Sequence, residues 1–370
     1  MVYRAIGLMS GSSMDGLDIA FVELDDSGGT WQYEVRASSC VPYSNEWVGK
    51  LKQAPALGAY AYLQLHAEYG RYLGQQVNSF IDEHHLHHQV QLVASHGHTA
   101  FHAPGDGFTA QLGDGAAIAA VTGINVVSDL RSMDVALGGQ GAPIVPVGEM
   151  LLWKGFDYFA NFGGIANISA RQAEVFTAFD VCPANSVLNT LAQLKGLLYD
   201  DNGSLARNGT IHQPLLHALN GLPYYAAPYP KSLANTFGSG VVYPLVQSYA
   251  LPVQDALCTY VEHIAQQVSA AVGLATQGTE QPVAGGLPKK MLVTGGGAFN
   301  GYLMGRLAEY LAPLGVGIEI PAAETVQYKE AIVMALLGVL RWREENTVLA
   351  SVTGASRNSI GGAVWIGQEA

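Results

Sequence analysis

A pattern that occurs twice in the chain constrains its fold more than any other feature. The segment Tyr3–Leu24 begins with an apolar stretch, passes through the small polar residues Ser10–Gly16, and continues with alternating apolar and acidic residues. Tyr158–Ala170 has a similar order, with Gly163 and Gly164 in its middle. Each segment is typical of two strands joined by a tight turn. Two such hairpins predict a duplicated architecture.

Strand and helix patterns alternate through the rest of the chain. Asp114 should cap a short helix at Gly115–Val121, and Glu330–Arg343, which is apolar nearly all round, should be a buried helix. The charge-poor stretch Gln277–Leu287 is typical of an exposed linker. Further strands are expected at Gln91–Ser95, Ile124–Val127 and Met291–Thr294, and further helices at Asp255–Leu274 and Asn300–Leu311. This alternation predicts an α/β fold with mixed sheets.

Length and composition agree with a two-domain α/β enzyme. The chain has 370 residues, more than one hydrophobic core usually serves. Apolar residues make up 49% of it and charged residues 13%, and 44 of its residues are glycines. A net charge of −12 argues against a nucleic-acid partner, which needs a basic surface. The N-terminus lacks a signal-peptide core, and no run approaches the roughly 18 apolar residues of a membrane span. We therefore expect a cytoplasmic protein without a membrane partner.

The cysteine and histidine patterns favour neither a disulfide framework nor a structural zinc site. Cys40, Cys182 and Cys258 are odd in number, scattered and without CxxC spacing. The run His84–His88 reads HHLHH and could bind a metal ion, but a solvated helix end or loop is the favoured interpretation.

The tip of the first hairpin is the first candidate site. From Gly7 to Asp18 it reads GLMSGSSMDGLD. Small residues let the backbone approach a polyphosphate, and the serine hydroxyls add hydrogen-bond donors. Asp15 and Asp18 could hold Mg²⁺, directly or through water. The alternative is an ordinary hairpin turn with polar side chains.

Two further turns follow strand patterns. FDVCPAN places Asp180 at a strand end, where α/β proteins commonly bind ligands, although Asp180 or Asn185 could instead cap a helix. TGGGAFN places Gly295–Gly297 between a strand and a helix whose free amides could meet a ligand. Its G-x-G-x-x-N spacing fails the dinucleotide fingerprint at the last position, and no GxxxxGK(S/T) loop occurs, so P-loop chemistry is excluded.

Isolated polar residues in apolar surroundings complete the set of candidates. Arg131 stands between Asp129 and Asp134, where it could belong to a salt-bridged loop or grip a substrate carboxylate. Glu330 begins an apolar helix, where it could simply complement the helix dipole. The two histidines of SHGHT, residues 95–99, could be loop histidines with internal partners.

Taken in order, these motifs resemble the actin/hexokinase-like kinases and, more closely, the anhydro-N-acetylmuramic acid kinase family. The strings that carry the resemblance run nearly from end to end: GLMSGSSMDGLD, SHGHTAFH, DLRSMDVALGGQGAPIVP, NFGGIANIS, FDVCPAN, YDDNGSLARNG, VTGGGAFNGYLM, KEAIVMALLG and SVTGAS. The resemblance implies a duplicated actin-like, ribonuclease H-like ATPase fold, with two lobes of mixed sheets flanked by helices and a central cleft. Residues 1–127 with about 347–370 would form the first lobe and 128–346 the second. It also suggests a homodimer.

The resemblance implies a kinase that uses ATP and Mg²⁺ on an anhydro amino sugar during peptidoglycan recycling. The family opens the 1,6-anhydro ring of N-acetylmuramic acid and phosphorylates O6, giving N-acetylmuramic acid 6-phosphate. By motif position Asp180 resembles the catalytic base. His98, Arg131 and Glu330 resemble substrate-binding residues, with Arg131 facing the lactyl carboxylate. The residues that would bind the nucleotide, among which Asp15 and Asp18 would hold the metal, are Gly11, Ser12, Ser13, Met14, Asp15, Gly16, Leu17, Asp18, Gly163, Gly164, Gly295, Gly296, Gly297 and Asn300.

The chain departs from the family pattern at several positions. The family usually reads Asp-Thr-Gly-Pro where this chain has Asp180, Val181, Cys182 and Pro183, a change that could weaken or reshape phosphate contacts. The run after Pro-Lys-Ser is altered at Leu233–Phe237, SGTS has become SGSS, and the glutamine of SHGQT is a histidine. Two alternatives therefore stay open, a kinase of the same fold for another amino sugar and a non-catalytic nucleotide-binding homologue. A nicotinamide oxidoreductase is disfavoured by the spacing of the glycine loop.

Overall fold

The structure, a computed structural model, describes residues 1–370 except 12–13, 173–174, 229–230, 235, 276–287 and 368–370. Contacts within the chain divide it into two units. Unit 1 comprises Met1–Lys154 and Tyr328–Ala370, and unit 2 comprises Gly155–Gln327. Unit 2 is thus one continuous stretch inserted into unit 1. The linker expected at Gln277–Leu287 lies outside the described residues.

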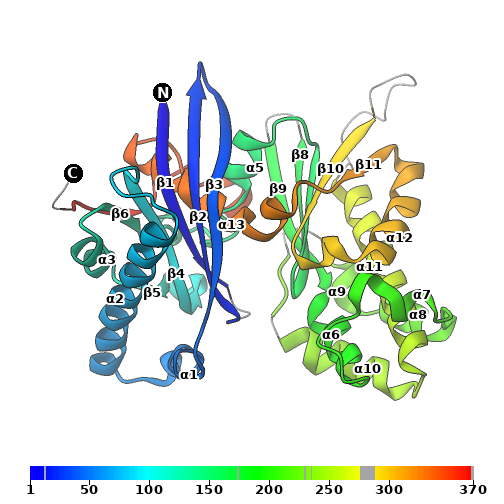
Figure 1. Ribbon diagram of the computed structural model, residues 1–370. Coiled ribbons are helices and arrows are strands. Elements are labelled where there is room, and N and C mark those ends of the chain that lie inside the picture. Colours follow the sequence, from blue (N-terminus) through cyan, green and yellow to red (C-terminus); the bar gives the residue numbers. More distant parts are fainter. Residues whose placement is uncertain (12–13, 173–174, 229–230, 235, 276–287, 368–370) are drawn as a thin grey trace. The chain divides into compact units, whose positions relative to one another are not determined.

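The sheet of unit 1 is built around the first hairpin (Figure 1). Its strand order is β12-β6-β4-β1-β2-β3, and β5 pairs with β4. The first three strands are antiparallel, whereas β4 is parallel to β1 and β6 is parallel to β4. The strands are β1 (Val2–Ser10), β2 (Gly16–Ser27), β3 (Thr30–Pro42), β4 (Leu92–Ala103), β5 (Phe108–Leu112), β6 (Asn125–Ser128) and β12 (Ala363–Trp365).

Helices cover the sheet of unit 1. The apolar side of α2 and residues of α3 share one buried cluster with β1, β2, β4 and β6. The helix α13 lies so close to β1 and β4 that a Cβ on Gly7 would come within 1.8 Å of the Ala331 carbonyl oxygen. The helices are α1 (Asn45–Gln53), α2 (Ala59–Glu83), α3 (Gly115–Thr122), α4 (Ser132–Ala136), α5 (Pro146–Leu152), α13 (Ala323–Trp342) and α14 (Ala350–Thr353).

The sheet of unit 2 has the order β11-β10-β7-β8-β9. Its strands are β7 (Tyr158–Phe162), β8 (Ile165–Gln172), β9 (Val175–Pro183), β10 (Lys289–Thr294) and β11 (Val316–Glu319). Its helices are α6 (Asn185–Gln193), α7 (Ser204–Arg207), α8 (Gln213–Asn220), α9 (Pro223–Ala226), α10 (Tyr243–Ser248), α11 (Val253–Ala275) and α12 (Gly301–Leu311). The long helix α11 contributes many side chains to the core of this unit, among them Tyr260 and Ile264.

The two sheets repeat one topology, so the duplication expected from the sequence is confirmed. In each, an antiparallel meander of three strands is extended by two parallel strands, β4 and β6 in unit 1 and β10 and β11 in unit 2. Mixed sheets flanked by helices in both halves agree with the predicted actin-like fold. The expected helices at Gly115–Val121 and Asn300–Leu311 are also present, and each begins after a capping side chain, from Asp114 and Asn300.

The unit boundaries differ from the expected lobes at 1–127 with 347–370 and at 128–346. Residues 128–154 and 328–346 lie in unit 1. The physical reason is the packing of α13, whose Gly338 lies against Ala94 of β4 and whose Ala331 lies against Gly7. The helix is also longer than the expected Glu330–Arg343 and has a non-helical residue at Tyr328, the first residue on the unit 1 side of the boundary.

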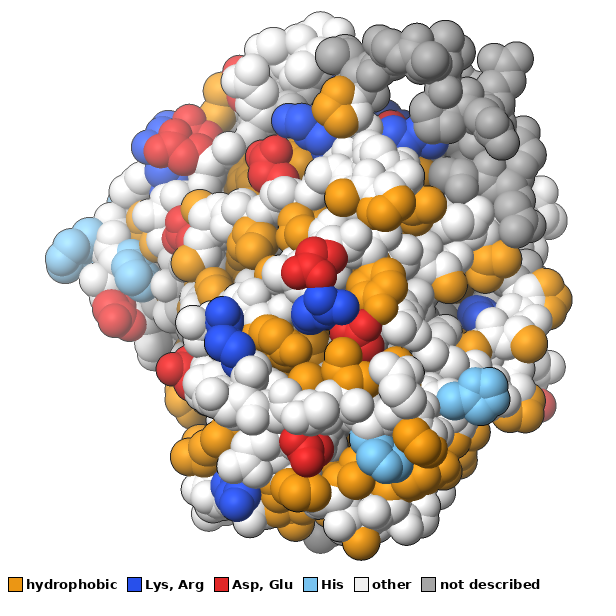
Figure 2. Space-filling view, turned by 90° about the vertical axis from the view of Figure 1, so that its right-hand side faces the viewer, with side chains coloured by type: hydrophobic (Ala, Val, Ile, Leu, Met, Phe, Trp, Pro, Cys, Tyr) orange, Lys and Arg blue, Asp and Glu red, His pale blue; other side chains and the backbone are white. Residues whose placement is uncertain are grey.

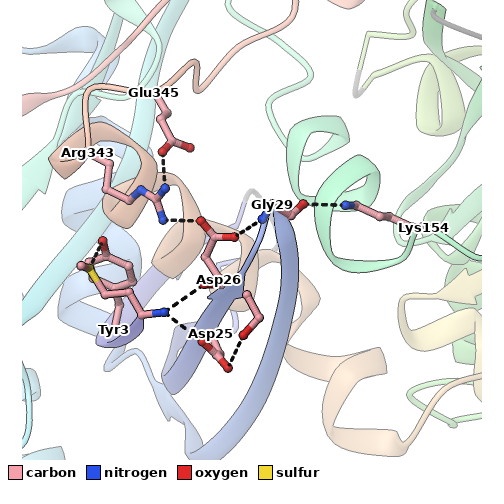
Figure 3. A network of polar contacts seen from close by, with 9 residues as sticks. Tyr3, Asp25, Asp26, Gly29, Lys154, Arg343 and Glu345 are labelled. Atoms are coloured by element: carbon pink, nitrogen blue, oxygen red, sulfur yellow. Dashed lines mark hydrogen bonds and ion pairs between the residues drawn. The ribbon is translucent and has the colours of Figure 1, made fainter.

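A polar network ties the end of α13 to the β2–β3 turn (Figure 3). Arg343 forms an ion pair of 2.8 Å with Asp26, whose other oxygen accepts the Gly29 N–H at 2.9 Å. The Gly29 carbonyl accepts a hydrogen bond of 2.8 Å from Lys154 Nζ. The Arg343 guanidinium is the main reason why the pKa of Asp26 lies below its usual value. The chain passes between the two units after Lys154 and again within α13. Lys154 and Arg343 of this network thus tie residues that follow or precede these two points to one turn of unit 1.

Charged residues make up 13% of the chain. On the face drawn in Figure 2, Lys and Arg side chains are scattered among acidic and apolar ones and form no continuous basic area within the coloured, described residues. No helix in the described part of the chain has both the length and the apolar composition needed to cross a membrane.

Candidate functional site

The tip between β1 and β2 holds the first group of predicted nucleotide-binding residues. Met14 has a left-handed backbone with φ of +56°, and its N–H donates to the Gly11 carbonyl at 3.3 Å. The Asp15 carboxylate accepts the Gly16 N–H at 3.0 Å. Leu17 is buried in the core of unit 1, so only its backbone could meet a ligand. The predicted residues Ser12 and Ser13 lie outside the described residues.

Asp18 is the carboxylate at this tip with the clearest electrostatic signature. Burial raises its pKa to about 6, and the neighbouring carboxylates of Asp15 and Glu330 act in the same direction. A hydrogen bond from the Cys40 thiol opposes this rise. The pKa of Cys40 is itself raised to about 12 by burial and by Asp18, so the thiol stays protonated and donates. A half-buried carboxylate with like-charged neighbours favours a bound cation.

These residues fit a magnesium ion that is shared with phosphate. The described residues contain no group of three or more His, Cys, Asp or Glu side chains able to hold a metal ion. The histidines of the run His84–His88, which follows α2, do not form such a group either. Mg²⁺, however, usually takes only one or two carboxylates and completes its shell with water and substrate phosphates. Asp18, with Asp15 beside it, suits that coordination.

His98 of β4 is buried opposite Ser10, the last residue of β1, and its ring joins a chain of hydroxyl groups. Its Nδ1 lies 3.0 Å from Ser10 Oγ, which accepts a hydrogen bond of 2.8 Å from Tyr43. The Tyr43 and Tyr69 hydroxyls are 2.6 Å apart. Burial lowers the pKa of His98, so its ring is neutral near pH 7.

Arg131 is fixed by two hydrogen bonds. Its Nε–H donates to His96 Nε2 at 2.8 Å, and its Nη1–H donates to the Gly141 carbonyl at 2.6 Å. Arg131 and Glu330 also act on one another, because each is among the charges that shift the other's pKa. The structure thus brings two of the predicted substrate-binding residues into one electrostatic environment.

Glu330 is held at the start of the part of α13 that lies in unit 1. Burial raises its pKa, while the positive charges of Lys329 and Arg131 oppose the rise. Lys329 forms an ion pair of 2.8 Å with Glu149 of α5, and both side chains are about 5% exposed or less. This pair joins α13 to α5 next to the predicted substrate-binding glutamate.

Two cavities occur in unit 1. One, of about 340 Å³, is lined by His96 and Ser95 of β4, by Asp129 and Ser132 after β6, and by residues of α2 and β5. The other, of about 650 Å³, lies near His87 and has none of the predicted site residues in its lining. The smaller cavity is therefore the one that adjoins the Arg131 environment.

Asp180 of β9 is the predicted base in unit 2. Its carboxylate accepts the Leu233 N–H at 2.9 Å, its own N–H donates to the Lys231 carbonyl at 3.1 Å, and its carbonyl accepts the Tyr224 hydroxyl at 2.7 Å. Burial raises its pKa, and the single hydrogen bond from Leu233 lowers it less. The altered run after Pro-Lys-Ser thus contacts Asp180 through its backbone, which tolerates a change of side chain.

The unusual residues Val181 and Cys182 point into the core of unit 2. They are 3% and 0% exposed and belong to the cluster formed by β7, β8, α6 and α11. Their side chains are therefore packing residues. The departure from Asp-Thr-Gly-Pro at these two positions therefore changes side chains that lie among apolar neighbours.

The glycines predicted to bind the nucleotide in unit 2 lie in two adjacent loops. The Gly163 carbonyl at the β7–β8 tip accepts the Asn185 N–H at 3.0 Å. A Cβ on Gly297 would come within 2.6 Å of Phe162 and 3.2 Å of Asn185 Oδ1, and Gly295 has φ of +78°. Gly164 and Gly296 lie in the same two loops, and their positions leave more room. Backbone crowding thus requires glycine at 295 and 297.

Asn300, at the end of the second loop, caps the following helix. Its Oδ1 accepts the Leu303 N–H at 3.0 Å and so caps α12. A Cβ on Gly203 would lie 2.3 Å from the same oxygen, which places the YDDNGSLARNG segment against it. Sequence reasoning missed this contact, and it missed Cys40, His96 and Leu233 as partners of predicted site residues, because none of them carries a local motif.

The duplicated fold, with a glycine-lined tip in each half and a half-buried aspartate in each sheet, defines a kinase of the actin/hexokinase-like class. Residues 3–367 match the family model for anhydro-N-acetylmuramic acid kinase. The chain is 34% identical to the anhydro-N-acetylmuramic acid kinase of Gloeobacter violaceus, over 95% of this chain and 96% of that protein. It is 31% identical to that of a Sulfurovum species, over 98% and 99%. The chain belongs to the anhydro-N-acetylmuramic acid kinase family.

One solved structure similar to this chain is an activator of 2-hydroxyisocaproyl-CoA dehydratase from Clostridium difficile with bound ADPNP. The match covers 92% of this chain and 96% of that chain, at 14% sequence identity and a TM-score of 0.46.

Proposed function

We propose that this kinase uses ATP to open the 1,6-anhydro ring of anhydro-N-acetylmuramic acid and to phosphorylate O6, with Asp180 as the base. Asp180 would take a proton from a water molecule as the water oxygen bonds to the anomeric carbon. The bond between that carbon and O6 breaks, and O6 bonds to the γ-phosphorus while ADP leaves. The product would be N-acetylmuramic acid 6-phosphate, made in the cytoplasm for peptidoglycan recycling.

The observation that carries this proposal is the environment of Asp180. A raised pKa brings a carboxylate closer to neutral pH, where a general base works best. Among the described residues, one backbone hydrogen bond, from Leu233, reaches the carboxylate, and its second oxygen would accept a hydrogen bond from a water molecule. Because the leaving O6 becomes the nucleophile, the reaction needs no separate general acid.

The other site residues would bind and orient the reactants. The backbone of Gly11–Asp18 would hold the ATP phosphates, Gly163 and Gly164 would contribute to the nucleotide site, and Gly295–Gly297 with Asn300 would face the nucleoside. Asp18, with Asp15, would hold Mg²⁺, which offsets phosphate charge when bound. Arg131 would pair with the lactyl carboxylate, and His98 and Glu330 would bind polar groups of the sugar. Family resemblance also supports a homodimer.

Product analysis in heavy-oxygen water tests the proposed reaction. The protein is incubated with 1,6-anhydro-N-acetylmuramic acid, ATP and Mg²⁺ in H₂¹⁸O, and the sugar product is examined by mass spectrometry. We expect one heavy oxygen at the anomeric position of a phosphorylated sugar and none in its phosphate. Label in the phosphate, or a phosphorylated sugar without label, would exclude the mechanism.

A further inference from the structure

Arg131 is held from two sides by groups that the proposed reaction does not otherwise use. An arginine side chain has five N–H donors in a rigid plane. Two of them are engaged here, by His96 at Nε and by the Gly141 carbonyl at Nη1. The hydrogen bonds of the described residues leave three N–H groups for a ligand. The plane of those three is set by the two bonds already made.

His96 can serve Arg131 in one tautomer. An arginine only donates, so His96 Nε2 must be the acceptor. His96 Nδ1 lies 2.9 Å from the Gly97 carbonyl and must therefore carry the proton. The ring is 4% exposed, and burial beside the Arg131 charge lowers its pKa to about 3, which keeps it neutral.

The backbone at Gly97 is shaped to hold this tautomer. Gly97 has φ of +72°, in the left-handed region that favours glycine. A Cβ at this position would come within 2.3 Å of the Leu112 carbonyl oxygen. The strand bends here, since the register between β1 and β4 shifts between Leu8 and Ser10. The bend belongs to the segment that gives His96 its carbonyl partner.

The other side of the guanidinium is anchored by a buried carboxylate. Asp134 is 1% exposed and accepts the N–H of Gly141 at 2.7 Å, the same residue whose carbonyl accepts the Arg131 hydrogen bond. Its second oxygen accepts the Thr353 hydroxyl at 2.7 Å. The strings GGQGAP and SVTGAS thus both contribute to holding Arg131, from separate parts of the sequence.

We propose that His96 is a positioning residue that aims Arg131 at the substrate carboxylate and so makes the enzyme selective for anhydro sugars that carry one. This inference rests on the proposed function, in which Arg131 binds the lactyl group. An unanchored guanidinium would still be charged, but it would sample many orientations and lose much of its bidentate geometry. Selectivity for the carboxylate would fall with it.

The test compares two substrates, 1,6-anhydro-N-acetylmuramic acid and 1,6-anhydro-N-acetylglucosamine, which lacks the lactyl group. We measure kcat/KM for both with wild type, His96→Leu, His96→Asn and His96→Gln. A hydrogen bond to a charged group corresponds to about 10- to 100-fold. His96→Leu should therefore lower the ratio of the two kcat/KM values by about this factor. His96→Gln, whose amide oxygen can reach the position of Nε2, should restore much of it, whereas the shorter His96→Asn should not.

Arg131→Met, measured in parallel, separates this inference from the proposed function. If Arg131→Met lowers the ratio and His96→Leu does not, the role of His96 is wrong while the role of Arg131 stands. An unchanged ratio in Arg131→Met overturns both roles. A purely structural role of His96 would lower both kcat/KM values equally, leave their ratio unchanged and overturn the inference. Thermal melting of each variant shows whether it folds, and His96→Asn replaces His96→Leu if the leucine variant does not.

Discussion

Each unit has an aspartate near the tip of its first two strands, but the aspartate lies on a different strand in each sheet. In unit 1, Asp18 of β2 lies opposite Cys40 of β3. At the corresponding place in unit 2, Asn167 of β8 lies opposite Asp180 of β9. The carboxylate thus lies on the middle strand of the three-stranded meander in unit 1 and on the third strand in unit 2, while the order and pairing of the meander strands are the same.

In the proposed mechanism, this difference lets one backbone arrangement support two kinds of chemistry. Asp18 has the like charges of Asp15 and Glu330 as neighbours and therefore favours a cation. Asp180 is buried, and a backbone N–H is the group that opposes its raised pKa, which suits proton transfer. The neighbouring charges, more than the fold, distinguish the electrostatic environments of the two aspartates.

The largest expected effect comes from removing the carboxylate of unit 2. Asp180→Asn keeps the shape and the bond from Leu233 but cannot accept a proton. Turnover of anhydro-N-acetylmuramic acid should fall about 10²- to 10⁴-fold, the usual contribution of a general base. Steady-state kinetics measure this, with Asp201→Asn as the control because Asp201 is an exposed acid of the same unit. A loss below about tenfold would assign the base elsewhere.

The ion pairs of the two units should differ in the same way as their burial. Lys329 and Glu149 of unit 1 are almost fully buried, whereas Lys290 and Glu319 of unit 2 are more than half exposed. Lys329→Met leaves a buried charge unpaired and should destabilise unit 1 by about 3–5 kcal/mol, whereas Lys290→Met should cost less than about 1 kcal/mol. Differential scanning calorimetry gives both values.

A matched double variant shows that the cost comes from the unpaired charge. Lys329→Met with Glu149→Leu removes both charges and should recover most of the lost stability. If the double variant is as unstable as Lys329→Met alone, packing around α13 explains the loss and the charge does not.

Asp18→Asn should increase stability while it removes activity. Well below pH 3.8, the ordinary pKa of aspartate, the carboxyl group is protonated in both states, so the variant and the wild type should be equally stable. Between pH 4 and pH 6 the folded wild type binds more protons than the unfolded chain, so its stability falls as pH rises. Above pH 6 the variant should be more stable by about 2 kcal/mol, after allowance for partial solvent exposure.

Urea unfolding at pH 4, 5, 6 and 7 measures this difference. A gap between Asp18→Asn and wild type that stays constant with pH would show that Asp18 titrates normally, and the contrast with Asp180 would then lose its electrostatic basis.

The smallest expected effect concerns the core beside Asp180. Cys182→Ala removes one buried sulfur atom and should cost about 1 kcal/mol in the free energy of unfolding. Because the side chain packs in the core of unit 2, kcat and the KM for ATP should stay within about twofold of wild type. Kinetics and urea unfolding of one preparation give all three values. A marked rise in the KM for ATP would show that the Cys182 side chain contributes to nucleotide binding.

Local patterns predicted much of the fold, and they predicted less of the site. The hairpins, the cap Asp114 and the buried run after Glu330 follow from residue periodicity and capping chemistry, which act over a few neighbouring positions. The family resemblance, carried by ordered motifs, supplied the class of enzyme.

The partners of the site residues could not be predicted because they are distant in sequence. His96 meets Arg131 across 35 positions, and Leu233 meets Asp180 across 53. Each contact depends on which strand lies beside which, and in the second case on a backbone N–H that has no sequence signature. The unit boundary at Tyr328 was missed for a related reason, since the helix continues through it.

The insertion of unit 2 into unit 1 has a consequence for synthesis on the ribosome. The strands β1 to β6 emerge first, but β12 and the part of α13 from Tyr328 onward, which pack against them, are translated only after all of unit 2. Until then the nascent first sheet exposes the apolar surface that α13 will cover, including the close contact at Gly7. Unit 2 is one continuous stretch, so its whole sequence is available before the last elements of unit 1 are made.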